Sequence, residues 1–152
     1  MGLDPGTRMP EFTLPDQDGK LFCSADLVGK NPLVVFFYPK DHTPGCTREV
    51  CAFRDNYEAF TDLGAVVVGI SSDSEKSHHD FAGKHRLPFR LLSDIGGKVR
   101  SLFEVKGSLF NLIPGRETFV ADSNGIIRMA FQSANAYGHM EKALKILKAE
   151  KL

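Results

Sequence analysis

Two cysteines, Cys46 and Cys51, lie in the part of this 152-residue chain that is richest in residues capable of chemistry. This stretch, residues 39–51, follows an apolar run and leads into a helical pattern. Thr43 is a favourable N-cap and Pro44 a favourable first helical residue, so Cys46 is predicted to lie in the first helical turn. Unpaired amides and the helix dipole stabilise negative charge there, and the thiolate is the nucleophilic form of cysteine. The pattern predicts an activated nucleophile at Cys46, and a buried, inert cysteine is the alternative.

The five-residue spacing of the two cysteines limits how they can react together. In an intact helix, five residues rise about 7.5 Å and rotate about 140°, which places the Cα atoms roughly 8 to 9 Å apart. A disulfide tolerates little beyond about 7 Å, so Cys46 and Cys51 can bond only if the first helical turns unwind. The pair is therefore either a redox switch or two unrelated thiols. The spacing excludes a Cys-x-x-Cys motif, and three cysteines without histidines at zinc-finger spacing argue against a structural zinc site.

The elements that position these cysteines alternate between strand and helix patterns. Valine-rich apolar runs at residues 33–38 and 65–70 predict strands that are covered on both faces. Between the two runs, apolar residues at spacings of three and four predict one face of a helix. These residues are Val50, Phe53, Tyr57 and Phe60. The order strand, helix, strand predicts a parallel pair joined by a crossover helix.

The remaining patterns predict two hairpins, three helices and one short strand. Asp-Gly and Asn-Gly turn signals mark the hairpins, one at residues 12–22 and one with strands 117–121 and 126–131. The helices are expected at 74–85, 97–103 and from about 136, and the short strand at 89–92. The sequence therefore predicts one α/β domain over residues 1–152, with a mixed central sheet, flanking helices and an N-terminal hairpin.

Composition and charge exclude several classes of partner. Nineteen Lys and Arg residues balance nineteen Asp and Glu residues, so no strong basic field exists to attract nucleic acid. The longest apolar run, residues 33–38, is far below the ~20 residues of a membrane span, so no membrane partner is expected. An odd number of cysteines is consistent with a reducing compartment.

Four residues in the cysteine stretch follow a spacing shared with a known family. Pro39, Thr43, Cys46 and Glu49 match the Pro-x-x-x-Thr-x-x-Cys-x-x-Glu pattern of the peroxiredoxins. Cys51 with Ala-Phe-Arg-Asp after it resembles the peroxiredoxin Q or bacterioferritin comigratory protein branch of the AhpC/TSA superfamily. The similarity extends along the chain to residues 10–14, 37–39, 69–71, 91–94 and 114–119.

The resemblance implies a thioredoxin-like fold and an antioxidant thiol peroxidase. In this family pattern, Cys46 is the peroxidatic cysteine and Cys51 the resolving cysteine, which form an intramolecular disulfide after peroxide reduction. The implied substrates are hydrogen peroxide and organic hydroperoxides, and the implied partner is thioredoxin or a similar dithiol donor. No metal or organic cofactor is required. The resemblance also favours a monomer. The expected location is the cytoplasm, with a plastid location after removal of a transit peptide as the alternative.

The same resemblance assigns roles to four further residues, each with a simpler alternative. Arg116 would bring fixed N–H donors and a positive charge to the thiolate, or would be an exposed charge at a strand end. Thr43 would place its hydroxyl on the peroxide, or would only cap the helix. Pro39 would shield the thiolate from water, or would merely end the strand. Glu49 would orient an arginine, or would be a carboxylate favoured by the helix dipole.

Other candidates have weaker support. Cys23 is interpreted as a packing residue or spare thiol. The helical histidines His78, His79 and His85 lack acidic partners in the sequence and are expected to be solvated rather than bound to metal. His42 is interpreted as a variable loop position, and the alternative is that its charged form lowers the pKa of Cys46. A redox-sensing interaction protein, in which oxidation of Cys46 and Cys51 remodels a helix, is the alternative function, and a holdase is a third.

Overall fold

A five-stranded mixed sheet forms the centre of the protein. The computed structural model describes residues 3–105, 116–133 and 136–150, and within them the strand order is β5-β4-β3-β6-β7. Strands β3 (Leu33–Phe37), β4 (Val66–Ser71) and β5 (Arg90–Ser93) are parallel. Strand β6 (Glu117–Ala121) is antiparallel to β3, and β7 (Ile127–Gln132) is antiparallel to β6. The sheet therefore has a parallel half and an antiparallel half, which meet at β3.

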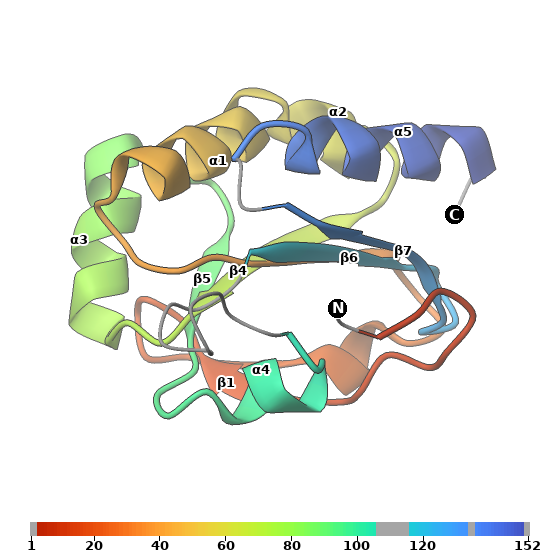
Figure 1. Cartoon of the computed structure of the whole chain (residues 1–152), viewed down its shortest axis with the longest axis horizontal. Coiled ribbons are helices and arrows are strands. Elements are labelled where there is room, and N and C mark those ends of the chain that lie inside the picture. The colour runs from red at the N-terminus through yellow and green to blue at the C-terminus, as the bar shows by residue number, and fades with distance from the viewer. Residues whose placement is uncertain (1–2, 106–115, 134–135, 151–152) are drawn as a thin grey trace.

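Helices and a small hairpin cover the two faces of this sheet (Figure 1). The upper layer in that view contains α1 (Pro44–Asp55), α2 (Tyr57–Asp62) and α5 (His139–Glu150), with α3 (Glu75–His85) beside β5. The opposite layer contains α4 (Lys98–Leu102), the hairpin β1 (Thr13–Pro15) and β2 (Leu21–Cys23), and the short 3₁₀ helix η1 (Ser24–Leu27). This arrangement confirms the expected mixed sheet with flanking helices and an N-terminal hairpin.

An apolar core lies on each face of the sheet, and strand β3 contributes side chains to both. All five of its residues are buried. Successive side chains of a strand point to opposite faces, so Val34 and Phe36 pack under α1 while Val35 and Phe37 pack over α4 and the hairpin. Phe36 stacks on Phe53 of α1, with ring centroids 4.5 Å apart. Burying one such side chain contributes about 1.5–3 kcal/mol, so these contacts fix α1 against the sheet.

The predicted element boundaries differ from the structure mainly at two places. The helix expected to carry Val50 through Phe60 is two helices, because Asn56 leaves helical geometry and its side-chain amide donates to the carbonyl of Ala52. The last helix begins at His139 rather than near residue 136, since Gly138 just before it adopts φ +90°. The other predicted strands and helices lie within one or two residues of their observed positions.

Candidate active site

Residues 38–43 connect the end of β3 to the first turn of α1. Thr43 is the N-cap residue, with extended backbone angles, and Pro44 is the first helical residue, as predicted. The Thr43 side chain does not cap the helix: its hydroxyl donates to the carbonyl of Lys40 at 2.8 Å. Both lone pairs of the Thr43 hydroxyl oxygen therefore remain able to accept hydrogen bonds.

Cys46 is the third residue of α1 and is completely buried. This position is in the first helical turn, where N–H groups without an acceptor within the helix stabilise negative charge. Arg116 donates from Nη2 to this sulfur at 3.4 Å. Burial fits both interpretations of Cys46 made from the sequence, but a guanidinium in contact with the sulfur favours a reactive thiol over an inert one.

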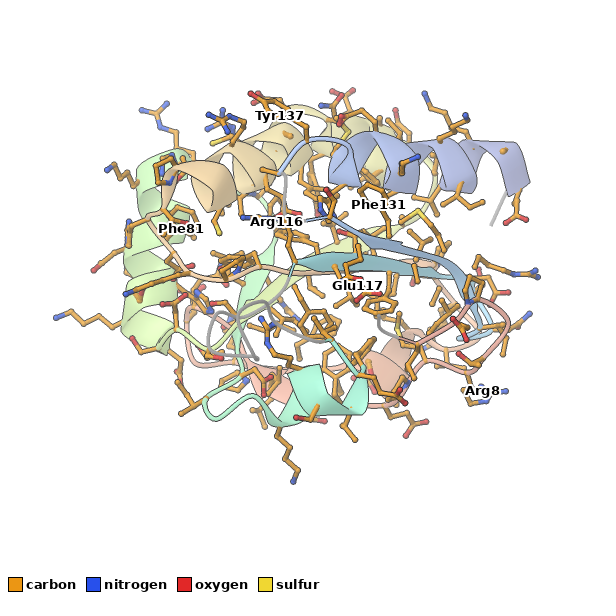
Figure 2. The ribbon with its side chains drawn as sticks, viewed as in Figure 1. Arg8, Phe81, Arg116, Glu117, Phe131 and Tyr137 are labelled. Carbon is orange, nitrogen blue, oxygen red and sulfur yellow. The ribbon has the colours of Figure 1, made fainter. Side chains whose placement is uncertain are left out.

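Arg116 reaches Cys46 because of the sheet register. It immediately precedes β6, whose first residue, Glu117, lies opposite Phe37 at the end of β3. Figure 2 shows Arg116 between the sheet and the helical layer. Its side chain is only 7% exposed, so the alternative of an exposed strand-end charge is wrong. Residues 114 and 115 of the family pattern lie outside the described residues.

Glu49 lies on the same face of α1 as Cys46 and holds Arg116 in place. It is three residues after Cys46 and fully buried, and its Oε1 accepts a hydrogen bond from Arg116 Nη1. Burial lowers the pKa of Arg116, but Glu49 and Cys46 raise it by more, so the guanidinium stays charged. Burial also raises the pKa of Glu49 from 4.5 to about 7, although Arg116 acts in the opposite direction. The pair is thus fully ionised only above neutral pH.

A buried histidine close to Glu49, His139, was not predicted from the sequence. Nδ1 of the buried His139 lies 3.7 Å from Glu49 Oε2 and 2.8 Å from the hydroxyl of Thr118. The other ring nitrogen, Nε2, contacts the carbonyl of Ser133 at 3.0 Å and must donate, because a carbonyl oxygen only accepts. His139 carried no recognisable motif in the sequence, and only the packing of α5 against α1 and β6 brings it to the site.

A second missed residue is Gly45, between Pro44 and Cys46. A Cβ atom at this position would lie 3.3 Å from Arg116 Nη2, which is tighter than nine in ten real Cβ contacts. Glycine therefore allows the guanidinium to approach the cysteine closely. The Thr-Pro-Gly-Cys sequence marked this region as a candidate site. Only the structure shows that its glycine leaves room for Arg116.

Cys51 is not brought to Cys46 in this structure. Both lie in the continuous helix α1, and all three cysteines of the chain are free thiols. Cys51 is half-buried on the side of α1 that faces α3, and Cys23 is half-buried with its sulfur accepting from the Thr13 hydroxyl at 3.4 Å. Pro39 follows β3 and is also half-buried. The described site therefore brings together Cys46, Arg116 and Glu49, with Thr43 as the N-cap of the same helix.

His78 corrects one expectation. It was expected to be solvated, yet its side chain is fully buried, with Nδ1 2.7 Å from Asp41 Oδ2 and Nε2 3.0 Å from the carbonyl of Leu92. The acidic partner comes from the loop after β3, 37 residues earlier, so a search along the helix could not find it. His79, in contrast, is largely exposed, as expected.

The cluster of Asp41, Asp73 and His78 is the described group of side chains whose geometry could hold a metal ion. Its oxygens already accept hydrogen bonds from the protein. Asp41 accepts from the hydroxyls of Tyr38 and Ser77 at 2.5 and 2.8 Å, and Asp73 accepts from the Ser71 hydroxyl at 2.6 Å. Since a metal would have to displace these donors, the cluster is a structural network that fixes the loop before α1 against α3.

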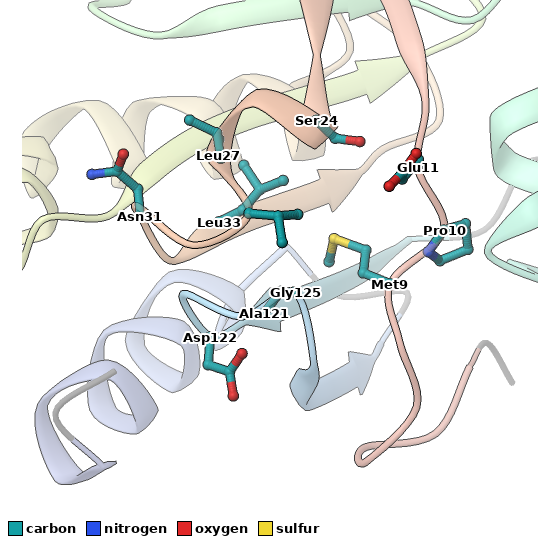
Figure 3. A pocket seen from close by; sticks show the side chains of 11 residues that line it. Met9, Pro10, Glu11, Ser24, Leu27, Asn31, Leu33, Ala121, Asp122 and Gly125 are labelled. Atoms are coloured by element: carbon teal, nitrogen blue, oxygen red, sulfur yellow. The ribbon is translucent and has the colours of Figure 1, made fainter.

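A small pocket lies at the opposite end of β3 from Cys46 (Figure 3). Met9, Leu27, Leu33 and Ala121 are among its lining residues. Its volume of about 20 Å³ has room for roughly one water molecule, so it does not offer a substrate site. Among the described helices, none is both long and apolar enough to cross a membrane.

Known proteins resemble this chain in sequence and fold over nearly its whole length. Residues 5–130 match the AhpC/TSA family. The chain is 49% identical over 147 residues to a chloroplastic peroxiredoxin Q from Sedum lineare, covering 96% of this chain and 78% of that protein. Peroxidoxin BcpB from Mycobacterium tuberculosis has a TM-score of 0.89 at 39% identity, with 97% of each chain covered. The bacterioferritin comigratory protein of Xanthomonas campestris has a TM-score of 0.88 at 30% identity, covering 98% of this chain and all of that one.

The thioredoxin-like fold and the arginine-bound thiol together define a thiol-dependent peroxidase. The chain belongs to the AhpC/TSA family, and the identity of almost one half places it in the peroxiredoxin Q branch. The resemblance inferred from the residues around Cys46 is therefore confirmed, as is the expected fold.

Proposed function

We propose that Cys46 is the peroxidatic cysteine of this peroxidase and that it reduces hydrogen peroxide and organic hydroperoxides. The observation that carries the proposal is the 3.4 Å contact between Arg116 Nη2 and Cys46 Sγ in a buried site. The Cys46 thiolate attacks one peroxide oxygen, the O–O bond breaks, and the leaving oxygen takes up a proton and departs as water or alcohol. Cys46 becomes a sulfenic acid.

Arg116 and Thr43 stabilise different atoms during this step. Arg116 donates to the reacting sulfur and to the oxygens that carry developing charge, and Glu49 fixes its orientation. The Thr43 hydroxyl already donates to Lys40, so its oxygen accepts the O–H of the incoming peroxide. Pro39, half-buried at the end of β3, limits the access of water to the thiolate.

Cys51 resolves the sulfenic acid within the same chain. Because Cys46 and Cys51 are about 8 to 9 Å apart at Cα in an intact helix, the first turns of α1 unwind before the disulfide forms. A dithiol donor of the thioredoxin type then reduces the disulfide by exchange. We assign this cycle to a single domain over residues 1–152 that acts as a monomer.

The cytoplasmic location expected from the sequence is not confirmed. The relative from Sedum lineare is named as chloroplastic, which supports the plastid alternative. Imaging of the full-length protein fused to a fluorescent reporter in its own cells tests this assignment, and a signal outside plastids would contradict it.

The catalytic cycle is tested by following NADPH oxidation with thioredoxin, thioredoxin reductase and peroxide. The wild type should turn over, whereas Cys46→Ser should be inactive and Cys51→Ser should oxidise once without being recycled by thioredoxin. Cys23→Ser is the matched control and should retain activity. Negligible wild-type turnover with every dithiol donor tried would instead favour the redox-sensing alternative, which needs the thiol pair but not the Arg116 contact.

A further inference from the structure

His85, in the last turn of α3, contacts the second cysteine of the pair. Its Nδ1 lies 3.8 Å from the Sγ atom of Cys51, within hydrogen-bond distance for sulfur, although 34 residues separate the two. A thiol in this position can donate its proton to a neutral imidazole nitrogen. The family pattern around Cys46 does not include His85.

The His85 ring has a defined position. It packs edge-on against Phe81, a fully buried residue one turn earlier, with ring centroids 5.1 Å apart. The His85 backbone is attached to α1, because its carbonyl accepts a hydrogen bond from Arg54 Nη1 at 2.9 Å. Arg86 then ends α3 in a left-handed conformation. The imidazole is thus held between two helices on the side facing Cys51.

The charges around His85 favour its neutral form. Burial lowers the pKa of the imidazole, and the positive charges of Lys84 on α3, Arg54 on α1 and His42 in the preceding loop act in the same direction. Below this lowered pKa the ring is protonated and cannot accept a proton; above it, including at neutral pH, the ring is the acceptor form. Arg54 also interacts electrostatically with Cys51.

Cys51 lies in the half of α1 that is tied to its surroundings. Two residues after Cys51, Phe53 stacks on Phe36 with ring planes 7° apart, and Arg54 binds the His85 carbonyl. Unwinding of the first turns of α1 can therefore carry Cys46 toward Cys51, while Cys51 stays beside His85. This arrangement keeps the proton acceptor next to the thiol that must react.

We propose that His85 is a catalytic residue of the resolving step, accepting the proton of Cys51 as its sulfur attacks oxidised Cys46. This inference rests on the proposed function. The Cys51 sulfur forms the S–S bond as the S–O bond of the Cys46 sulfenic acid breaks. The Cys51 sulfur is oxidised and the Cys46 sulfur reduced, and the hydroxide that leaves takes up the proton from the His85 imidazolium to give water. One thiol and one sulfenic acid thus yield one disulfide and one water.

The test separates the two steps of a single turnover. Reduced protein in a Cys23→Ser background is mixed with one equivalent of hydrogen peroxide and acid-quenched. Mass spectrometry then gives separate rates for Cys46 oxidation and for disulfide formation. His85→Gln removes the base, and His79→Gln is the matched control, because His79 is an exposed histidine of the same helix. Chemical rescue of His85→Ala by added imidazole provides a second readout.

At pH 7 we expect His85→Gln to slow disulfide formation at least about tenfold more than it slows Cys46 oxidation, while His79→Gln behaves as wild type. The difference in the rate of disulfide formation between wild type and His85→Gln should disappear above about pH 9, where an ordinary thiol ionises without a base. Imidazole should accelerate disulfide formation in His85→Ala. Equal rates in wild type and His85→Gln, a defect of the same size at every pH, or no rescue by imidazole would each overturn the role of His85. A wild type that forms no Cys46–Cys51 disulfide at all would instead overturn the proposed cycle.

Discussion

Arg116 Nη2 lies 3.4 Å from Cys46 Sγ, although the two residues are 70 positions apart in the sequence. The antiparallel pairing of β6 with β3 places the residue before β6 beside the helix that follows β3. The fork of the guanidinium then serves two partners, since Nη1 donates to Glu49 while Nη2 donates to the sulfur. One buried cation is thus both oriented by a carboxylate and directed at the nucleophile.

Replacing Arg116 by lysine tests how much the two fixed N–H groups of the guanidinium contribute to the reaction. Arg116→Lys keeps the positive charge but loses the two fixed N–H directions, so the rate constant for reaction with peroxide should fall about 100- to 1000-fold. Competition with a haem peroxidase of known rate measures this constant. Arg128→Lys is the control, because Arg128 is a half-exposed residue of β7 paired with Asp122. An Arg116→Lys rate within a few-fold of wild type would contradict the role given to Arg116.

Glu49 should make the stability of the protein depend on pH. Burial raises the pKa of Glu49 from 4.5 to about 7, so between these pH values the folded protein binds a proton here that the unfolded chain has lost. The contribution of Glu49 to the free energy of unfolding is therefore fully present below pH 4.5 and falls as the pH rises to 7, by on the order of 3 kcal/mol. Glu49→Gln removes this dependence. Urea unfolding of both proteins from pH 4.5 to 8 measures it, and parallel pH profiles would contradict the expectation.

The sequence supported prediction of the fold to the extent that local patterns determine it. Valine-rich runs located β3 and β4, and turn signals located both hairpins, because these features depend on neighbouring residues. The break at Asn56 was missed, since the apolar spacing of three and four continues across it. A side chain that bonds to its own backbone does not alter that spacing.

The site residues that lie on one helix could be predicted from local sequence patterns. Those that tertiary contacts bring to the site could not. Thr43, Cys46 and Glu49 could be placed from spacing and helix-capping rules. Arg116 was identified only through the family resemblance, because the register between β3 and β6 is not readable from either strand alone. His139 came from α5, a helix with no motif, so nothing in the sequence linked it to Glu49.

A substitution at Gly45 should affect the stability and the activity of the protein in different ways. Alanine is a better helix former than glycine by up to about 1 kcal/mol, so Gly45→Ala should leave thermal stability unchanged or raise it. Its Cβ would lie 3.3 Å from Arg116 Nη2, and the buried pair with Glu49 leaves the guanidinium little room to move. We expect the reaction with peroxide to slow about tenfold, a loss of roughly 1.4 kcal/mol of transition-state stabilisation.

Gly83→Ala in α3 is the matched control for this experiment. A Cβ at Gly83 would meet no atom within 4 Å, so the same gain in helix propensity comes without a steric cost. Both variants are compared with wild type by thermal unfolding and by competition for peroxide. Equal peroxide rates in the two alanine variants would show that Arg116 adjusts without loss.

The buried pair of Asp41 and His78 should contribute strongly to stability. Burial raises the pKa of Asp41, but the hydrogen bond and charge of His78, together with hydrogen bonds from Tyr38 and Ser77, outweigh burial and lower it below its ordinary value of 3.8. His78→Leu fills a similar volume but leaves Asp41 buried without this partner, so the free energy of unfolding should fall by about 3 kcal/mol or more. Chemical denaturation at pH 7 measures the change. His79→Leu, at the neighbouring exposed position, should shift stability by no more than about 0.5 kcal/mol.

The pH dependence of the same pair gives an independent check. A carboxyl group whose pKa is lowered by folding stabilises the protein above its unfolded pKa, and this contribution is lost as the pH falls through the folded value. The wild type should therefore lose stability below about pH 4 more steeply than His78→Leu, in which Asp41 no longer has its partner. Combining Asp41→Asn with His78→Leu removes the uncompensated charge and should recover part of the loss at pH 7. A double variant that is less stable than His78→Leu would show that Asp41 stabilises the fold through Tyr38 and Ser77 rather than through His78.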